Sequence, residues 1–293
     1  SCRIHNTHIR MLSAESQTSQ ALFDDPRARS LIIGATLGAL CTRIASILLP
    51  IEMCGFMLHL SLPAMVILCV FMIDLLTGQH RTSDTSILMW MGGAIGVILD
   101  ETLWLIVRNP PLVPTDVEQV GYWSVASLLF SVGGVLLFCI GVAIGSRLNR
   151  GEQKLPRIEA PHLGIASVVL IGGLVFFHVS QAIIRHDVAN EDRSLVILGY
   201  EIHHIVEGQI LLMIALLLLV FAGEQEWPWR LAFLFTMVGA LFVADEILYY
   251  QLVDVSDDAY FGAMTIISGG MMCTMLLVQM GLGSRSASMV EDE

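Results

Sequence analysis

The chain has 293 residues, of which 55% are hydrophobic and only 14% are charged. A soluble domain carries about 25% charged residues, so this composition excludes an ordinary water-soluble protein and indicates a polytopic protein of the lipid bilayer. Acidic residues outnumber basic ones by 27 to 15, and the net charge of −12 excludes a general role in nucleic-acid binding.

Eight apolar stretches are long enough to cross a bilayer, which takes about 20 residues per helix. In chain order they cover residues 30–50, 52–76, 86–108, 122–146, 163–186, 198–222, 230–252 and 259–283. Polar segments separate them, such as TGQHRTSD after the second stretch and RNPPLVPTD after the third. The sequence therefore predicts an all-α integral membrane protein of about eight transmembrane helices.

Three polar segments lie outside these stretches: an N-terminal segment at 1–29, a basic linker at 147–162 and an acidic tail at 284–293. Residues 1–29 lack the apolar core of a signal peptide. Met11 is an alternative start, in which case the first ten residues would be upstream sequence.

The basic residues predict the orientation. Of the 15 Lys and Arg residues, 11 fall on the side of the N-terminus, three on the opposite side and one, Arg43, within a span. Because cytoplasmic loops carry the excess of Lys and Arg, we expect both termini in the cytoplasm. The expected location is the plasma membrane of a prokaryote.

The two halves of the chain repeat one pattern. GVILDETLWLI carries Asp100 and Glu101, and LFVADEILYYQ carries an Asp-Glu pair 145 residues later. The same offset relates His59 to His204, so each of these histidines precedes its aspartate by 41 residues. The sequence thus predicts two four-helix repeats, 30–146 and 163–283. Since four spans are an even number, the repeats should be parallel.

Ionisable residues collect at one predicted depth, near the outer ends of the second, third, sixth and seventh spans. Charged groups inside a membrane normally face the bundle interior or a wet cavity, so we expect one shared polar site. Imidazole and carboxylate ligands together favour iron, zinc or manganese. The predicted ligands of a divalent transition metal, or of two metals, are His59, Asp100, Glu101, Glu201, His204 and Asp245.

Spacing gives the remaining roles. Glu201 and His204 form an E-x-x-H pair, the ligand pattern of di-iron carboxylate bundles. Glu207 and Glu246 are the predicted general bases. His178 is interpreted as a histidine hydrogen-bonded across helices, and Arg43 as the cation that neutralises a carboxylate of the cluster. Four glycine pairs indicate close helix contacts, at 92–93, 133–134, 172–173 and 269–270.

The motifs HHIVEG (203–208) and VADEILYY (243–250) resemble those of uncharacterised multi-pass membrane proteins of bacteria and archaea. The resemblance covers about 50 residues of the second half and implies no activity. The first half departs from it, with HLSLP in place of H-H-x-x-x-G.

Three functions fit this pattern. The first is a metal site open to the outside, which as an enzyme would act on a lipid-like substrate. The second is a cation or proton transporter that uses the same carboxylates. The third is a non-catalytic subunit of a membrane assembly, or a homo-oligomer, in which the cluster is a structural ion-pair network. Haem ligation is a further alternative, which the neighbouring carboxylates disfavour.

Overall fold

A computed structural model describes residues 25–48, 60–108, 125–148, 156, 158–187, 196–197, 200–201, 204–221, 226–246 and 262–289. Its first half contains α2 (Pro26–Leu48), α4 (Ser61–Leu76), α5 (Thr85–Arg108) and α7 (Val125–Leu148). Its second half contains α8 (Ala160–Ser167), the π-helical turn η1 (Val168–Gly172), α9 (Gly173–Asp187), α10 (His204–Phe221), α11 (Glu226–Glu246) and α13 (Ala263–Met289). The short strands β1 (Val196–Ile197) and β2 (Tyr200–Glu201) pair antiparallel just before α10.

Among the described residues, six helical segments are long and apolar enough to cross a membrane, which confirms an all-α, multi-pass membrane protein. They are Pro26–Ala45, Ser127–Leu148, Ala160–Ser180, His204–Phe221, Glu226–Glu246 and Ala263–Ser284. Two of the eight predicted spans are not among them. The helix α4 has only 16 residues, and the side chains of α5 after Glu101 lie outside the described residues.

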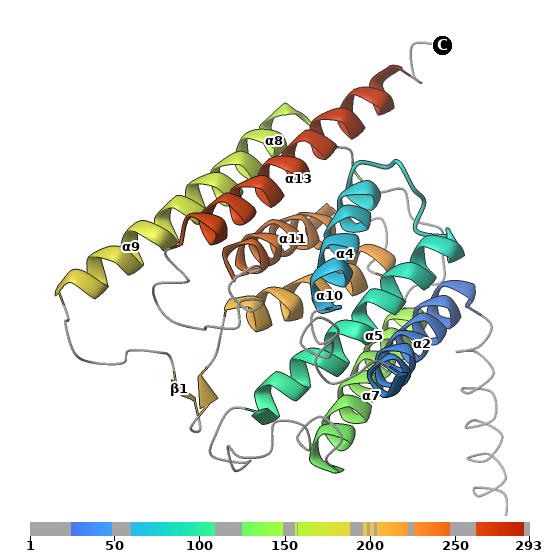
Figure 1. Cartoon of the computed structure of the whole chain (residues 1–293). Coiled ribbons are helices and arrows are strands. Elements are labelled where there is room, and N and C mark those ends of the chain that lie inside the picture. The colour runs from blue at the N-terminus through green and yellow to red at the C-terminus, as the bar shows by residue number, and fades with distance from the viewer. Residues whose placement is uncertain are drawn as a thin grey trace, which may run out of the picture.

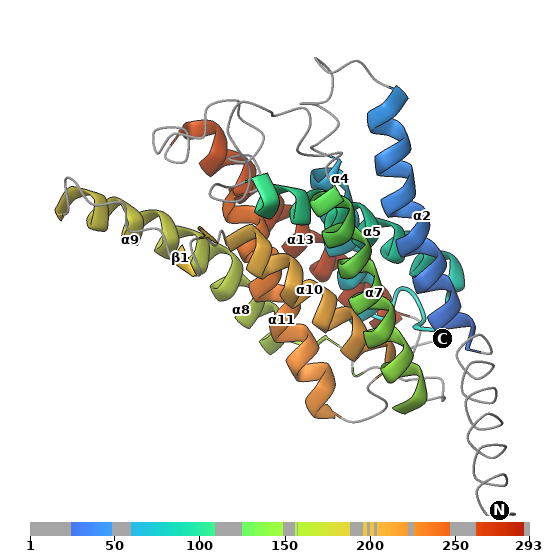
Figure 2. The ribbon, with the colours of Figure 1, turned by 90° about the horizontal axis from the view of Figure 1, so that it is seen from below.

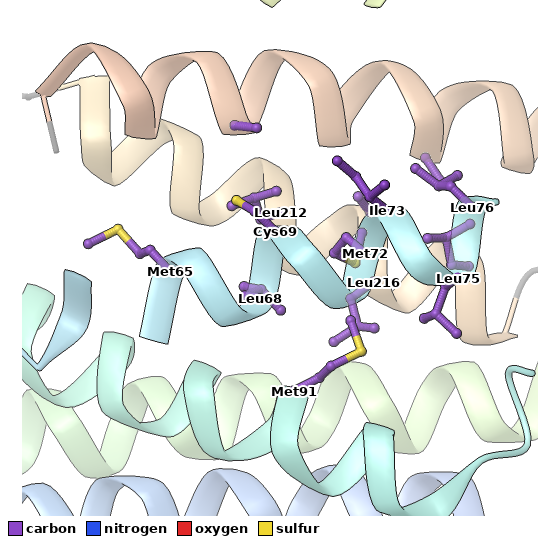
Figure 3. Close-up of a cluster of buried hydrophobic side chains, with 14 of the residues drawn as sticks. Met65, Leu68, Cys69, Met72, Ile73, Leu75, Leu76, Met91, Leu212 and Leu216 are labelled. Atoms are coloured by element: carbon purple, nitrogen blue, oxygen red, sulfur yellow. The ribbon is translucent and has the colours of Figure 1, made fainter. Parts of the chain in front are cut away.

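The short helix α4 lies in the middle of the bundle (Figure 1), where it contacts α5, α10, α11 and α13. Its side chains supply much of the core, and Figure 3 shows several of them between α5, α10 and α13. Leu68, Cys69 and Met72 have no exposed surface. Because its neighbours shield α4, little of its surface is left for lipid.

Glycines let α2 and α5 pack backbone to backbone. A Cβ at Gly38 would lie 2.1 Å from the carbonyl oxygen of Gly93, and one at Gly96 would lie 2.0 Å from that of Ala35. Such close approach is typical of small residues spaced four apart in membrane helices. The contact continues one turn further, where it brings Arg43 of α2 to Asp100 of α5.

A second glycine contact joins α10 to α11. A Cβ at Gly208 would lie 2.7 Å from the carbonyl oxygen of Gly239, and a Cβ at Gly239 would lie 2.8 Å from that of Gly208. The contact lies one turn from His204 and closes α10 onto the end of α11. Of the four predicted glycine pairs, three have a member in a close helix contact, namely Gly92, Gly173 and Gly269, whereas Gly133 and Gly270 have open space beside them.

The segments α8, η1 and α9 follow one another as one long helix (Figures 1 and 2), of which α8 and η1 contact α13. The π-helical turn η1 packs against α11 and α13. A π-turn adds a residue to one helical turn and rotates the faces of the helix that follows. This rotation helps to determine which side chains of α9 face α11.

Candidate metal site

The candidate site lies where α10 begins and α11 ends. His204 is the first residue of α10, and its Nδ1 lies 3.3 Å from Oδ2 of Asp245. The Asp245 side chain is fully buried, whereas that of His204 is 29% exposed. The site therefore consists of a buried carboxylate whose imidazole partner reaches the surface of the bundle.

Glu246 is held beside this pair by the helix backbone. Its Oε2 accepts a hydrogen bond of 3.0 Å from the backbone N–H of Ile205, in the first turn of α10. A carboxylate at a helix N-terminus satisfies a free N–H and interacts favourably with the helix dipole. The contact places a second carboxylate next to His204.

Ligand atoms of His204, Asp245 and Glu246 all lie within 4.8 Å of one another, close enough for one metal ion to contact all three. In a tetrahedral site with bonds of about 2.0 Å, neighbouring ligand atoms are about 3.3 Å apart. The distance of 3.3 Å between Nδ1 of His204 and Oδ2 of Asp245 matches this value. One imidazole and two carboxylates form a donor set that suits zinc, iron or manganese.

Aromatic rings hold the imidazole of His204 in place. The ring of Phe177 stacks on it at a centroid distance of 5.0 Å, and that of Phe242 at 5.4 Å. Their planes are tilted from the imidazole by 29° and 28°. The two phenyl rings also contact each other, with their centroids 5.5 Å apart, so they lie on the same side of the imidazole and restrict its rotation.

His178 is the residue whose part in the site the sequence did not predict. Its Nδ1 lies 3.3 Å from Oδ1 of Asp245, on the carboxylate oxygen that His204 does not contact. The expected hydrogen bond across helices is therefore present, and its partner is the central carboxylate of the site. A histidine that donates to a ligating carboxylate orients that ligand.

The first half of the chain holds its aspartate differently. Nε of Arg43 lies 2.7 Å from Oδ1 of Asp100, and Nη2 of Arg43 donates to Oγ of Ser127 at 3.0 Å. The hydroxyl of Ser131 also donates to Asp100. The predicted pairing of Arg43 with a carboxylate is confirmed. Asp100 thus contacts a cation of the protein itself, whereas Asp245 contacts two imidazoles.

Glu101 and Glu246 share a role that the sequence did not predict. Oε2 of Glu101 accepts a hydrogen bond of 2.7 Å from the backbone N–H of Ser61, where α4 begins. Each glutamate therefore caps the N-terminus of the preceding helix of its own half. The other oxygen of Glu101 is buried and has no hydrogen-bond partner within the described ranges.

The remaining predicted ligands and bases lie as follows. His59 is outside the described residues. Glu201 lies in strand β2, because α10 begins only at His204, so the two residues do not share a helix face as the E-x-x-H argument assumed. Glu207 is half-buried in the first turn of α10. Asp100 and Glu101 lie in the contacts of the first half and are not part of the His204 group.

Comparison of the chain with protein-family models, with curated proteins and with solved structures finds no match.

Proposed function

We propose that the protein binds a divalent transition metal through His204, Asp245 and Glu246. The observation that carries this proposal is the mutual approach of three ligand atoms within 4.8 Å at a largely buried position. Two neighbouring carboxylates repel each other unless positive charge lies between them. In the first half Arg43 supplies such a charge, and in the second half a metal ion would supply it.

The surroundings of the site support the same proposal. Glu246 is fixed by the N–H of Ile205, Asp245 by His178, and the ring of His204 by two phenylalanines. Metal sites depend on such outer contacts, which set the orientation of each ligand. When bound, the metal would act as a Lewis acid. Glu207, three residues from His204 and therefore on the same side of α10, would hold a proton beside it.

We also propose that the chain consists of two parallel repeats, residues 30–146 and 163–283, with α4 and α5 crossing the membrane as well. The helix contacts support it. The helix α7, last in the first repeat, contacts α10, second in the other, and α13 contacts α4 in the same way. The equivalent caps made by Glu101 and Glu246 agree with a common origin of the two halves.

The two halves meet close to their polar clusters. Nε2 of Gln209 donates to Sδ of Met65 at 3.2 Å, which joins the second turns of α10 and α4. Ser61 and His204 lie about 6–8 Å from this contact along their helices, at 1.5 Å per residue. Both clusters therefore belong to one layer, and the excess of Lys and Arg on the side of the N-terminus favours the outer leaflet for this layer. The exposed part of the His204 side chain would let a lipid-like substrate of that leaflet reach the site.

Elemental analysis of the chain, purified in mild detergent without chelator, tests the metal site. We expect about one divalent transition metal per chain, as for a single site with three protein ligands. His204→Ala should lose it, whereas His80→Ala, a change at a partly exposed histidine of the loop after α4, should retain it. Equal metal contents in the two variants, or none in the wild type, would leave the structural ion-pair network as the better account.

Stability separates these two alternatives further. A ligand that binds only the folded form adds about 2.7 kcal/mol at 100 times its dissociation constant. Added metal should therefore raise the melting temperature of the wild type and leave that of His204→Ala unchanged. A purely structural cluster would show no such response to metal.

A further inference from the structure

A second polar group is buried at the opposite end of α4. Asp74 is only 8% exposed, although it lies in the last turn of an apolar helix. Its Oδ1 accepts a hydrogen bond of 2.6 Å from Nε2 of Gln279 on α13. Its Oδ2 has His80 at 4.0 Å, too far for a hydrogen bond.

The charge of Asp74 lacks a strong cationic partner in this part of the protein. Within the ranges that the structure describes, no Lys or Arg pairs with this carboxylate. The side chain of Gln279 offers a second hydrogen-bond acceptor. Its Oε1 is buried and has no hydrogen-bond partner among those residues. Buried acceptors without donors are costly, so this arrangement favours a ligand that brings N–H groups and positive charge.

A groove opens beside these acceptors. It has a volume of about 460 Å³ and is lined by Asp74, Gln79, Met275, Val278, Gln279 and Leu282. Ligand pockets commonly have volumes of about 300–1,000 Å³, so it is large enough for a small organic group. The close packing of Gly283 against Thr77 and Gln79 joins α13 to the end of α4 at this point.

The other wall of the groove is apolar and belongs to the outer surface of the bundle. Met275, Val278 and Leu282 follow one another along a single face of α13 and are 41%, 55% and 58% exposed. Because α13 is a candidate membrane span, this exposed face meets lipid chains. The helix runs alongside α4 in Figure 3, and the lipid-facing stripe borders Gln279, which donates to the buried carboxylate.

We infer that this groove binds a phospholipid with a primary ammonium head group, of the phosphatidylethanolamine type. The ammonium group donates to the carboxylate of Asp74 and to Oε1 of Gln279. The acyl chain lies along Met275, Val278 and Leu282. This site is separate from the proposed metal site, at the other end of α4, and either can fail without the other.

Lipid titration of the full-length chain, followed by native mass spectrometry in detergent, tests this inference. Phosphatidylethanolamine is compared with phosphatidylcholine of the same acyl chains, whose trimethylated nitrogen has no N–H. Hydrogen bonds to charged groups contribute about 1.5–3 kcal/mol, so we expect a preference of roughly tenfold or more for phosphatidylethanolamine. Equal binding of the two lipids would overturn the inference.

Two variants and a control test whether the lipid binds in this groove. Asp74→Asn removes the charge but keeps an oxygen that can accept from Gln279, and it should abolish the preference. Asp84→Asn makes the same change in charge at the start of α5, outside the groove lining, and should keep it. Val278→Trp fills the groove from an exposed position without changing charge, and should weaken binding of both lipids. Retention of the preference in Asp74→Asn, or its loss in Asp84→Asn, would contradict the assignment.

A soluble amine would present the same ammonium group to Asp74 and Gln279 as the lipid does. Free phosphoethanolamine, added at the concentration of the lipid, should not displace it, because it lacks the acyl chain that contacts α13. Displacement at equal concentration would overturn the lipid part of the inference. If Asp74→Asn does not fold, as judged by its melting temperature, Val278→Trp alone decides, and unchanged lipid binding in that variant contradicts the site.

Discussion

Substitution of Gly208 by alanine tests whether the close contact of α10 with α11 positions the metal site. The new Cβ would lie 2.7 Å from the carbonyl oxygen of Gly239, where ordinary contact begins at 3.4 Å. The helices must therefore separate by about 0.7 Å (3.4 minus 2.7), and a methyl group forced into a packed interface costs about 1–3 kcal/mol. The same shift would lengthen the 3.3 Å separation of His204 and Asp245 to about 4.0 Å.

Gly270→Ala is the matched control for this change. Gly270 lies in α13 with nothing within 4 Å of a built Cβ, so the gain in helix propensity is the same and only the clash differs. We expect Gly208→Ala to bind metal about tenfold or more weakly than Gly270→Ala, as for other losses of ligand orientation. Metal titration and denaturant unfolding in mixed micelles provide the measurements. Equal affinity and stability in the two variants would refute the positioning role of this contact.

Further predictions concern the two clusters and the topology. Arg43→Gln should destabilise the protein by about 3–5 kcal/mol, because it leaves Asp100 buried without its cation. Adding Asp100→Asn should restore part of this loss. Arg230→Gln, which removes a solvent-exposed ion pair with Glu226, is the control and should cost about 1 kcal/mol or less in the same unfolding assay. Glu246→Gln should lose metal by elemental analysis at a small cost in stability, since a glutamine oxygen still accepts the N–H of Ile205. Single cysteines introduced in the acidic loops, at Asp116, Asp187 and Asp257, should react with an impermeant thiol reagent added outside. A single cysteine at Lys154 should not react. If only the cysteine at Lys154 reacts, the orientation is the opposite of the predicted one.

The polar pairs within each half could be predicted largely from spacing. The distance of 41 residues between His204 and Asp245 corresponds to one helix, a turn and most of a second helix, and the two side chains do meet. The pairing of Arg43 with a carboxylate followed from the cost of a charge inside the membrane, and the structure identifies that carboxylate as Asp100. Both inferences needed only helix geometry and the positions of charged residues.

The contacts that the sequence missed depend on details of packing. His178 follows the π-turn η1 and contacts Asp245, and a regular period of 3.6 residues does not anticipate the change of helical face that such a turn introduces. The helix α10 begins at His204 and not at residue 198, which moves Glu201 into a strand. The capping by Glu101 and Glu246 requires the two helices of each half to be adjacent, which composition alone does not specify.

X-ray absorption spectroscopy of the protein loaded with one equivalent of zinc tests the proposed metal site most directly. The account predicts a first shell of nitrogen and oxygen atoms at about 2.0–2.2 Å, with the multiple scattering of a single imidazole. The spectrum of His204→Ala should lose the imidazole signal, and that of His80→Ala should keep it. A sulfur shell at about 2.3 Å, or an imidazole signal unchanged in His204→Ala, would show that the metal is bound elsewhere and contradict the account.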